Sequence, residues 1–109
     1  MDKYYTQKLS AANLQRCYEI ASPRIQQYLE AEIQHVLGKI RSGDALLELG
    51  CGYGRILNRL AVEAEHAAGI DSSWESLAMG AEMLRDNCHL LQMDAAALAF
   101  KDRTFDVVA

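Results

Sequence analysis

Residues 45–57, ALLELGCGYGRIL, decide the fold of this chain. The apolar run Ala45 to Leu49 follows the turn signal Ser42-Gly43-Asp44 and suits a strand buried on both faces of a parallel sheet. Three glycines come next at every second position, and apolar residues recur at helical spacing from Ile56 onward. A strand that enters a helix through glycines brings bare backbone N–H groups and the positive end of a helix to one point. We therefore expect a ligand to bind at this turn.

The glycines and the acid before them narrow down the ligand. Gly50, Gly52 and Gly54 lack Cβ atoms, so the backbone can adopt positive φ and lie against a ligand. Glu48 stands at the end of a buried strand, where a carboxylate needs a partner or a place at the edge of a crevice. It would repel a diphosphate, and Arg55 occupies the position where the dinucleotide fingerprint requires its third glycine. The pattern E-x-G-x-G-x-G instead suits a ligand that carries an ammonium or sulfonium charge.

Residues 48–54 resemble the first motif of the class I S-adenosylmethionine-dependent methyltransferases. Asp71 ends the next apolar run and resembles the acid that binds both ribose hydroxyls in this family. Asp94 ends the run after that and resembles the acid that accepts from the adenine amino group, with the Ala95 backbone beside it. The segment 94–108 is also similar to the family's run into its fourth strand. Three acids at the ends of three successive strand-like runs make this resemblance specific.

The resemblance covers Gly43 to Ala109 and implies a Rossmann-like parallel sheet of strand order 3-2-1-4, truncated from a seven-stranded fold. It implies S-adenosyl-L-methionine as the cofactor and S-adenosyl-L-homocysteine as the product. No catalytic residue is identified: a nucleophilic acceptor requires mainly that donor and acceptor are held in line, whereas a hydroxyl or carbon acceptor would need a base. No metal ligand is predicted. The predicted cofactor-binding residues are Glu48, Gly50, Cys51, Gly52, Gly54, Asp71, Ser72, Asp94 and Ala95.

Residues 1–42 are predicted to form a separate N-terminal helical segment. Ser10 is expected to cap a first helix whose one face carries Leu14, Cys17, Tyr18 and Ala21. Ser22 and Pro23 predict the start of a second helix, with an apolar stripe of Ile25, Tyr28, Leu29, Ile33, Val36, Leu37 and Ile40.

In the family, leading helices of this kind often lie beside the cofactor pocket. On that resemblance Tyr5, Tyr18 and Arg24 are candidates to touch the methionine carboxylate or to cover the acceptor site. The alternative is that Tyr18 packs between helices and that Arg24 lies in solvent.

A helix is expected from about Tyr53 to residue 63 or 64, followed by a strand over His66 to Asp71. The capping box 72–75 predicts that Ser72 caps the next helix, which leaves the Asp71 carboxylate for a ligand; the alternative is that Asp71 itself is the cap. The buried face of that helix is predicted to comprise Trp74, Leu77, Ala78, Ala81 and Leu84.

The last two strands are predicted over Cys88 to Met93 and Phe105 to Ala109, with a structural role for Asp106. The whole alternation of helices and strands predicts an α/β fold with right-handed crossovers.

Composition excludes several classes of function. The chain has 109 residues, enough for one domain, and a net charge of −4 without a basic block, so no general electrostatic attraction to nucleic acid or to an anionic membrane is expected. RNA as a methyl acceptor stays open on this ground. Three widely spaced cysteines predict reduced thiols in a cytoplasmic protein rather than a disulfide framework or a zinc site. No apolar stretch approaches the ~20 residues that span a bilayer, and the first residues do not form a secretory signal.

The leading prediction is a methyltransferase that acts on a small-molecule acceptor. Because the acceptor half of the family's fold is missing, the chain is expected to be a fragment that is inactive alone. Its fourth strand would then be an exposed edge that can pair with another copy. The alternatives are a non-catalytic module that binds the cofactor or regulates, and a nicotinamide-dependent oxidoreductase, which Glu48 and the glycine spacing disfavour.

Overall fold

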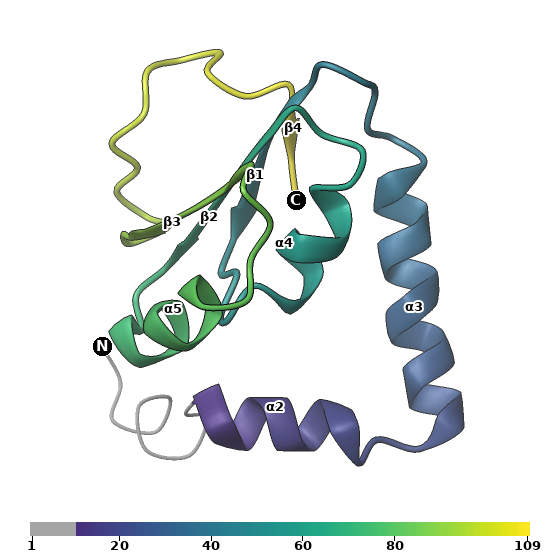
Figure 1. The fold of residues 1–109 in the computed structure, drawn as a ribbon. Coiled ribbons are helices and arrows are strands. Elements are labelled where there is room, and N and C mark those ends of the chain that lie inside the picture. Colours follow the sequence, from purple (N-terminus) through teal and green to yellow (C-terminus); the bar gives the residue numbers. More distant parts are fainter. Residues whose placement is uncertain (1–10) are drawn as a thin grey trace.

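The computed structural model describes residues 11–109, which form a parallel sheet with helices on one of its faces (Figure 1). The elements are α2 (Ala11–Glu19), α3 (Pro23–Leu37), β1 (Ala45–Leu49), α4 (Arg55–Leu60), β2 (His66–Asp71), α5 (Trp74–Ala81), β3 (Cys88–Gln92) and β4 (Val107–Val108).

The sheet has the order β3-β2-β1-β4, and every neighbouring pair of strands is parallel. Leu47 pairs with Ala68 of β2 on one side and with Val108 of β4 on the other, which places β1 in the middle of the sheet. The predicted fold class and strand order are therefore confirmed. The Asp106 carboxylate accepts from the Ala45 backbone N–H at 2.8 Å, which is the structural role expected of it.

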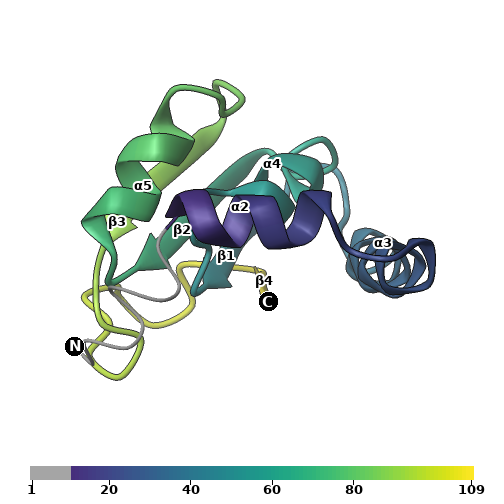
Figure 2. The ribbon, with the colours of Figure 1, turned by 90° about the horizontal axis from the view of Figure 1, so that it is seen from below.

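The sheet has two differently covered faces, because successive side chains of a strand point to opposite sides. The helices α4 and α5 lie over one face, and the loop of residues 93–106 lies over the other (Figure 2). The helix-side core comprises Ile33, Ile40, Leu46, Leu57, Leu60, Ala61, Ala64 and Ala67. The loop-side core comprises Leu47, Ala68 and Ile70, with Met93, Phe100 and Phe105 packed against them.

The helix after the glycine turn is shorter than predicted. It begins at Arg55 rather than at Tyr53, because Gly54 has a left-handed backbone with φ of 85° and so stands outside the helix. It ends at Leu60, and the chain then turns. The side-chain amide of Asn87 donates to the carbonyls of Ala61 and of residue 64 at 2.9 and 3.0 Å, which satisfies groups that a longer helix would use.

The next helix, α5, begins one residue later than the capping box predicted. Ser73 is its cap and accepts from the Ser76 N–H at 3.3 Å, so the prediction of Ser72 as the cap is wrong. The buried face also differs from the predicted one: Trp74 is 67% exposed, Ala78 and Ala81 are exposed as well, and the buried residues of the helix are Ser76, Leu77 and Gly80.

The two leading helices have different surroundings. Ser22 caps α3 as predicted, since its hydroxyl accepts from the Ile25 N–H at 3.3 Å. Only the second half of the predicted stripe reaches the core, because the first half of α3 extends past the sheet (Figure 1). Ile25 and Tyr28 are therefore exposed, and so is Cys17 of the predicted α2 face.

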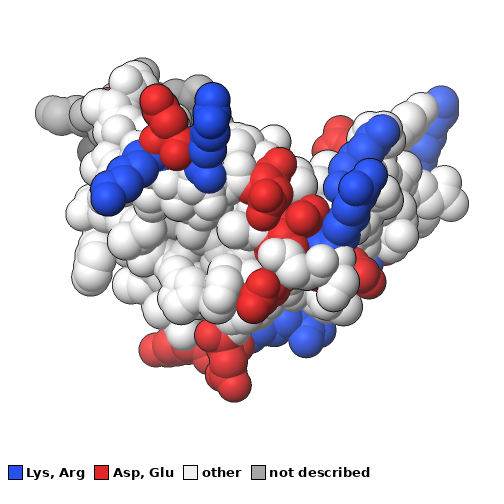
Figure 3. Space-filling model, turned by 90° about the horizontal axis from the view of Figure 1, so that it is seen from above, with Lys and Arg blue, Asp and Glu red and all other residues white. Residues whose placement is uncertain are grey.

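The helix α2 runs across the end of the sheet at which the strands terminate (Figures 1 and 2), and it contacts α5. The predicted cap Ser10 and the candidate Tyr5 lie outside the described residues. Within residues 11–109, no helix is both long and apolar enough to cross a membrane. Acidic and basic side chains alternate over the face shown in Figure 3, which belongs to the opposite end of the molecule from α2.

Candidate functional site

The glycine turn after β1 leaves an open backbone surface. Gly50, Gly52 and Gly54 have φ of 70°, 57° and 85°, a region that side chains other than glycine rarely adopt. A Cβ atom at Gly50 or Gly52 would meet nothing within 4 Å, whereas one at Gly54 would come to 2.7 Å from Leu84 Cδ2. The first two glycines therefore border free space and the third allows close packing.

The carboxylate of Asp71 ties the tip of β2 to this turn. One of its oxygens accepts from the Gly52 N–H at 2.9 Å, and the other accepts from the Ser73 N–H at 2.8 Å. The predicted Ser72 cap implied that the Asp71 carboxylate has no partner in the protein. The structure instead gives it two backbone partners. Each oxygen retains a lone pair, so the group can still accept from a ligand hydroxyl while it holds the turn.

Glu48 is more deeply buried than a residue at the edge of a crevice, which was one of the two positions expected from the sequence. Alternation along β1 directs its side chain to the same face as Leu46, under α4, and the residue is only 7% exposed. Burial raises the pKa of its carboxyl to about 7, although the Arg55 charge and the Leu57 N–H act in the other direction. Its Oε1 atom is buried and has no hydrogen-bond partner within the described part of the chain.

Cys51 shapes the turn from its inner side. Its N–H donates to the Ile70 carbonyl at 2.9 Å, and its side chain lies against Gly69, where an added Cβ would come to 2.7 Å from the sulfur. Burial raises the pKa of the thiol to about 12, so it is not a nucleophile at neutral pH. A contact between Cys51 and the cofactor stays a prediction.

The other predicted site residues lie at the ends of β2 and β3. Ser72 is exposed, and its carbonyl accepts from the Gln92 side chain at 3.1 Å. Asp94 and Ala95 are exposed in the loop that follows β3, and Asp94 Oδ1 accepts from the Ala96 N–H at 2.9 Å. The structure thus brings Glu48, Asp71 and the glycine turn into direct proximity, with Asp94 farther out on the neighbouring strand end.

A second cluster next to the turn was missed by the sequence analysis. The guanidinium of Arg55 stacks on the Tyr18 ring of α2, with Cζ 3.9 Å from the ring centroid. Tyr18 had been considered for the methionine carboxylate, for covering the acceptor site or for packing between helices, and Arg55 only as a departure from a dinucleotide motif. Arg24 is exposed on α3. No group of three or more His, Cys, Asp or Glu side chains suited to a metal ion is found between residues 11 and 109.

A parallel sheet of order 3-2-1-4 with a glycine turn after its central strand defines an α/β protein of the Rossmann-like class. A family model described as a methyltransferase domain matches residues 46–109, more than half of the sequence, and the chain therefore belongs to this family. The resemblance predicted from the sequence motifs is thereby confirmed. A comparison with curated protein sequences found no significant match.

Solved structures show the same fold. The complex of DhpI with SAH matches 97% of this chain and 48% of its own, with a TM-score of 0.72 and 24% identity. The 4+2 cyclase SpnF matches 76% of this chain and 34% of its own, with a TM-score of 0.69 and 27% identity. An S-adenosylmethionine-dependent methyltransferase from Mesorhizobium loti matches 62% of this chain and 32% of its own, with a TM-score of 0.58 and 25% identity. The chain spans between about a third and a half of the length of these proteins.

Proposed function

We propose that this chain binds S-adenosyl-L-methionine at the glycine turn and is the cofactor-binding part of a methyltransferase for a small molecule. The observation that carries the proposal is the buried Oε1 of Glu48, which has no hydrogen-bond partner among the described residues and lies directly behind a turn whose Gly50 and Gly52 border open space. Buried polar atoms without partners call for an explanation, and a cationic ligand at this turn supplies one.

The residues present fit such a cofactor. Burial raises the pKa of Glu48 to about 7, and a cationic group bound beside it would favour the ionised carboxylate that pairs with the ammonium or sulfonium charge. The open backbone at Gly50 and Gly52 admits close contact. Asp71 can accept from the ribose hydroxyls through its remaining lone pairs. Asp94 and Ala95 would hold the adenine, with Cys51, Gly54 and Ser72 completing the predicted contacts. When bound, the cofactor supplies an electrophilic methyl group on a positively charged sulfur.

The contribution of the chain itself is to hold and orient the cofactor and to exclude water from it. Holding two reactants in a fixed orientation removes most of the entropic cost of bringing them together from solution, and a nucleophilic acceptor then needs no base. The helix α2 crosses the end of the sheet that carries the turn and is placed to restrict access of water (Figure 2). The acids Glu48, Asp71 and Asp94 are therefore ligands of the cofactor in this proposal and not proton-transfer groups.

A small-molecule acceptor is supported by charge. The net charge of −4 gives no general attraction for a nucleic acid backbone. Cys17, Cys51 and Cys88 form no disulfide, which agrees with the proposed cytoplasmic location.

A second candidate function is cofactor binding without methyl transfer. SpnF, a structure 27% identical to this chain over the matched region, is described as a cyclase, so the fold alone does not define the reaction. Methyl transfer from labelled S-adenosyl-L-methionine by the protein that contains this chain separates the two candidates.

Calorimetric titration with S-adenosyl-L-homocysteine tests the proposal, with NAD as the competing ligand. We expect binding of the first and none of the second, and the reverse result would favour the oxidoreductase alternative. Gly52→Asn should weaken binding at least ~10-fold, because asparagine tolerates positive φ but fills the open space with a side chain.

Gly43→Asn is the matched control, since Gly43 also has positive φ but lies in the turn before β1, away from the site. Equal affinities for the two variants would contradict the proposed location of the cofactor.

A further inference from the structure

A pocket of about 480 Å³ lies between α2, α3 and α4, beside the glycine turn. Its volume falls in the range of sites for small molecules. Tyr18 and Tyr53 contribute aromatic rings to its wall, and Leu29 and Ile33 contribute aliphatic side chains. Because Tyr53 stands between Gly52 and Gly54 in sequence, the pocket and the proposed cofactor site share the turn as a common wall.

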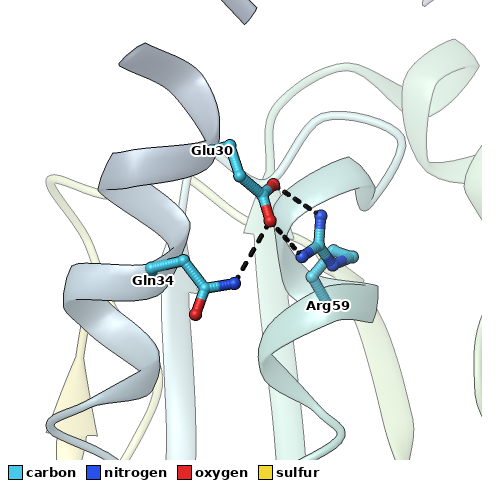
Figure 4. Close-up of polar contacts among 3 residues, drawn as sticks. All are labelled: Glu30, Gln34 and Arg59. Carbon is cyan, nitrogen blue, oxygen red and sulfur yellow. Dashed lines mark hydrogen bonds and ion pairs between the residues drawn. The ribbon is translucent and has the colours of Figure 1, made fainter. Parts of the chain in front are cut away.

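One of the two arginines in this pocket is already paired. Arg59 of α4 donates two hydrogen bonds to the carboxylate of Glu30 on α3, at 2.7 and 2.8 Å (Figure 4). Gln34 donates a third to the same carboxylate at 3.1 Å. The hydrogen bond from Arg59 is the main cause that lowers the pKa of Glu30 to about 2, so this carboxylate is ionised and Arg59 has a full partner.

The other arginine, Arg55, has no acidic partner within residues 11–109. Its guanidinium lies over the face of the Tyr18 ring, with Cζ 3.9 Å from the ring centroid, and the residue is half-buried. A guanidinium stacked on a ring keeps its N–H donors in its own plane, pointing outward at the edge. That arrangement fits the two oxygens of a carboxylate. The nearby Glu48 senses the Arg55 charge, but its Oε1 accepts no hydrogen bond.

The remaining walls restrict the charge and polarity of the ligand. Glu19 and Glu30 also line the pocket, and their negative charges disfavour a dianion such as a phosphate. The rings and the aliphatic side chains favour an apolar body. We propose that this pocket binds a small, partly apolar carboxylic acid, that Arg55 holds its carboxylate, and that this acid is the methyl acceptor. A nucleophilic atom of the acid outside that carboxylate would form the new bond to the methyl carbon as the methyl–sulfur bond breaks. The electron pair of that bond would stay on the sulfur of S-adenosyl-L-homocysteine, and any proton on the accepting atom would pass to solvent. Only the acceptor role depends on the function proposed above.

Binding of benzoate and of its neutral counterpart benzamide tests the proposal, measured by chemical-shift titration of the labelled protein. We expect benzoate to bind at least ~10-fold more tightly than benzamide, because a bidentate charged pair contributes more than a neutral hydrogen bond. Arg55→Gln should abolish this preference, and Arg55→Lys should retain part of it, since lysine keeps the charge without the planar fork. Arg41→Gln, at an exposed arginine in the loop after α3 that does not line the pocket, is the matched control.

Equal binding of benzoate and benzamide, or an unchanged preference in Arg55→Gln with a folded circular dichroism spectrum, would overturn the proposal. Titration of the same samples with S-adenosyl-L-homocysteine separates it from the proposed function. If S-adenosyl-L-homocysteine binds but benzoate is not preferred over benzamide, only the proposed carboxylate pocket is contradicted. If benzoate is preferred but S-adenosyl-L-homocysteine does not bind, the proposed function is contradicted, and with it the acceptor role. A further outcome is that benzoate and S-adenosyl-L-homocysteine compete for binding and that Arg55→Gln weakens the binding of both equally. This result would assign Arg55 to the carboxylate of the cofactor and overturn the acceptor assignment.

Discussion

Glu48 gives the stability of this protein a pH dependence. Its carboxyl has a pKa raised from 4.5 to about 7, chiefly by burial. An acid whose pKa is higher in the folded state binds its proton more tightly there, so stability falls as the pH rises from 4.5 through 7. We expect the free energy of unfolding to decrease by about 3 kcal/mol over this window on account of this one residue.

Urea unfolding at several pH values between 4.5 and 8 measures this effect. Glu48→Gln should give a flatter profile and a higher stability than wild type at pH 8, because its amide carries no charge to bury. Glu63→Gln, a change at an exposed residue, serves as the control. Parallel profiles for the wild type and Glu48→Gln would show that the carboxyl is not buried in the folded protein.

Asp71 has both a structural and a proposed binding role. Asp71→Ala removes the acceptor of the Gly52 and Ser73 N–H groups and should lower the free energy of unfolding by about 1–3 kcal/mol. It should also weaken binding of S-adenosyl-L-homocysteine by about 2–3 kcal/mol, since the ribose hydroxyls lose a charged acceptor.

Thermal unfolding and calorimetric titration of the same variant measure the two roles of Asp71 separately. A stability loss with an unchanged dissociation constant would leave Asp71 as a turn-holding residue only.

At the scale of elements, the contact between α5 and the glycine turn requires a missing side chain. A Cβ atom at Gly80 would overlap the backbone carbonyl of Tyr53. Gly80→Ala should therefore push α5 away from the turn and destabilise the fold by about 1–3 kcal/mol, despite the better helix propensity of alanine.

The matched control for this contact is Gly38→Ala at the end of α3. Its Cβ would lie at ordinary distances of 3.5 and 3.6 Å from the His35 and Gln34 carbonyls, and its φ is negative. We expect the free energy of unfolding of this variant, measured in urea, to lie within about 0.5 kcal/mol of the wild-type value. Similar losses in both variants would mean that the helix, and not its contact with the turn, accounts for the effect of Gly80→Ala.

At the scale of the whole molecule, the uncovered strand β4 favours self-association. Among the strands of residues 11–109 it pairs with β1 alone, and Val108 is 57% exposed. An unpaired strand edge can add a strand from a second copy. We expect light scattering to show dimers that increase with concentration, and Val108→Lys should shift them towards monomers.

Val62→Lys makes the same change at a residue 56% exposed in the turn after α4 and should leave the association unchanged. A monomer at high concentration, or equal effects of the two lysines, would contradict pairing through β4.

The positions of the strands along the chain were predictable because their signals are local, whereas their order in the sheet was predicted from the resemblance to the family. Each strand is a short apolar run bounded by turn residues, and the glycines at 50, 52 and 54 all adopt the positive φ that their spacing suggested. The Ser22 cap and the structural role of Asp106 were predictable for the same reason. The ends of α4 and the start of α5 were not, because Asn87 and the packing of Gly80 on Tyr53 act across the fold.

By itself, the sequence determined the positions of the strands, the glycine turn and the acids at the strand ends, since apolar period and glycine content act over a few neighbouring residues. Only the tertiary structure decided that Glu48 is buried with an oxygen that has no hydrogen-bond partner among residues 11–109, that Asp71 holds the turn, and that Arg55 meets Tyr18. These features depend on how helices far apart in the chain pack against the sheet, and packing sets burial, partners and charge.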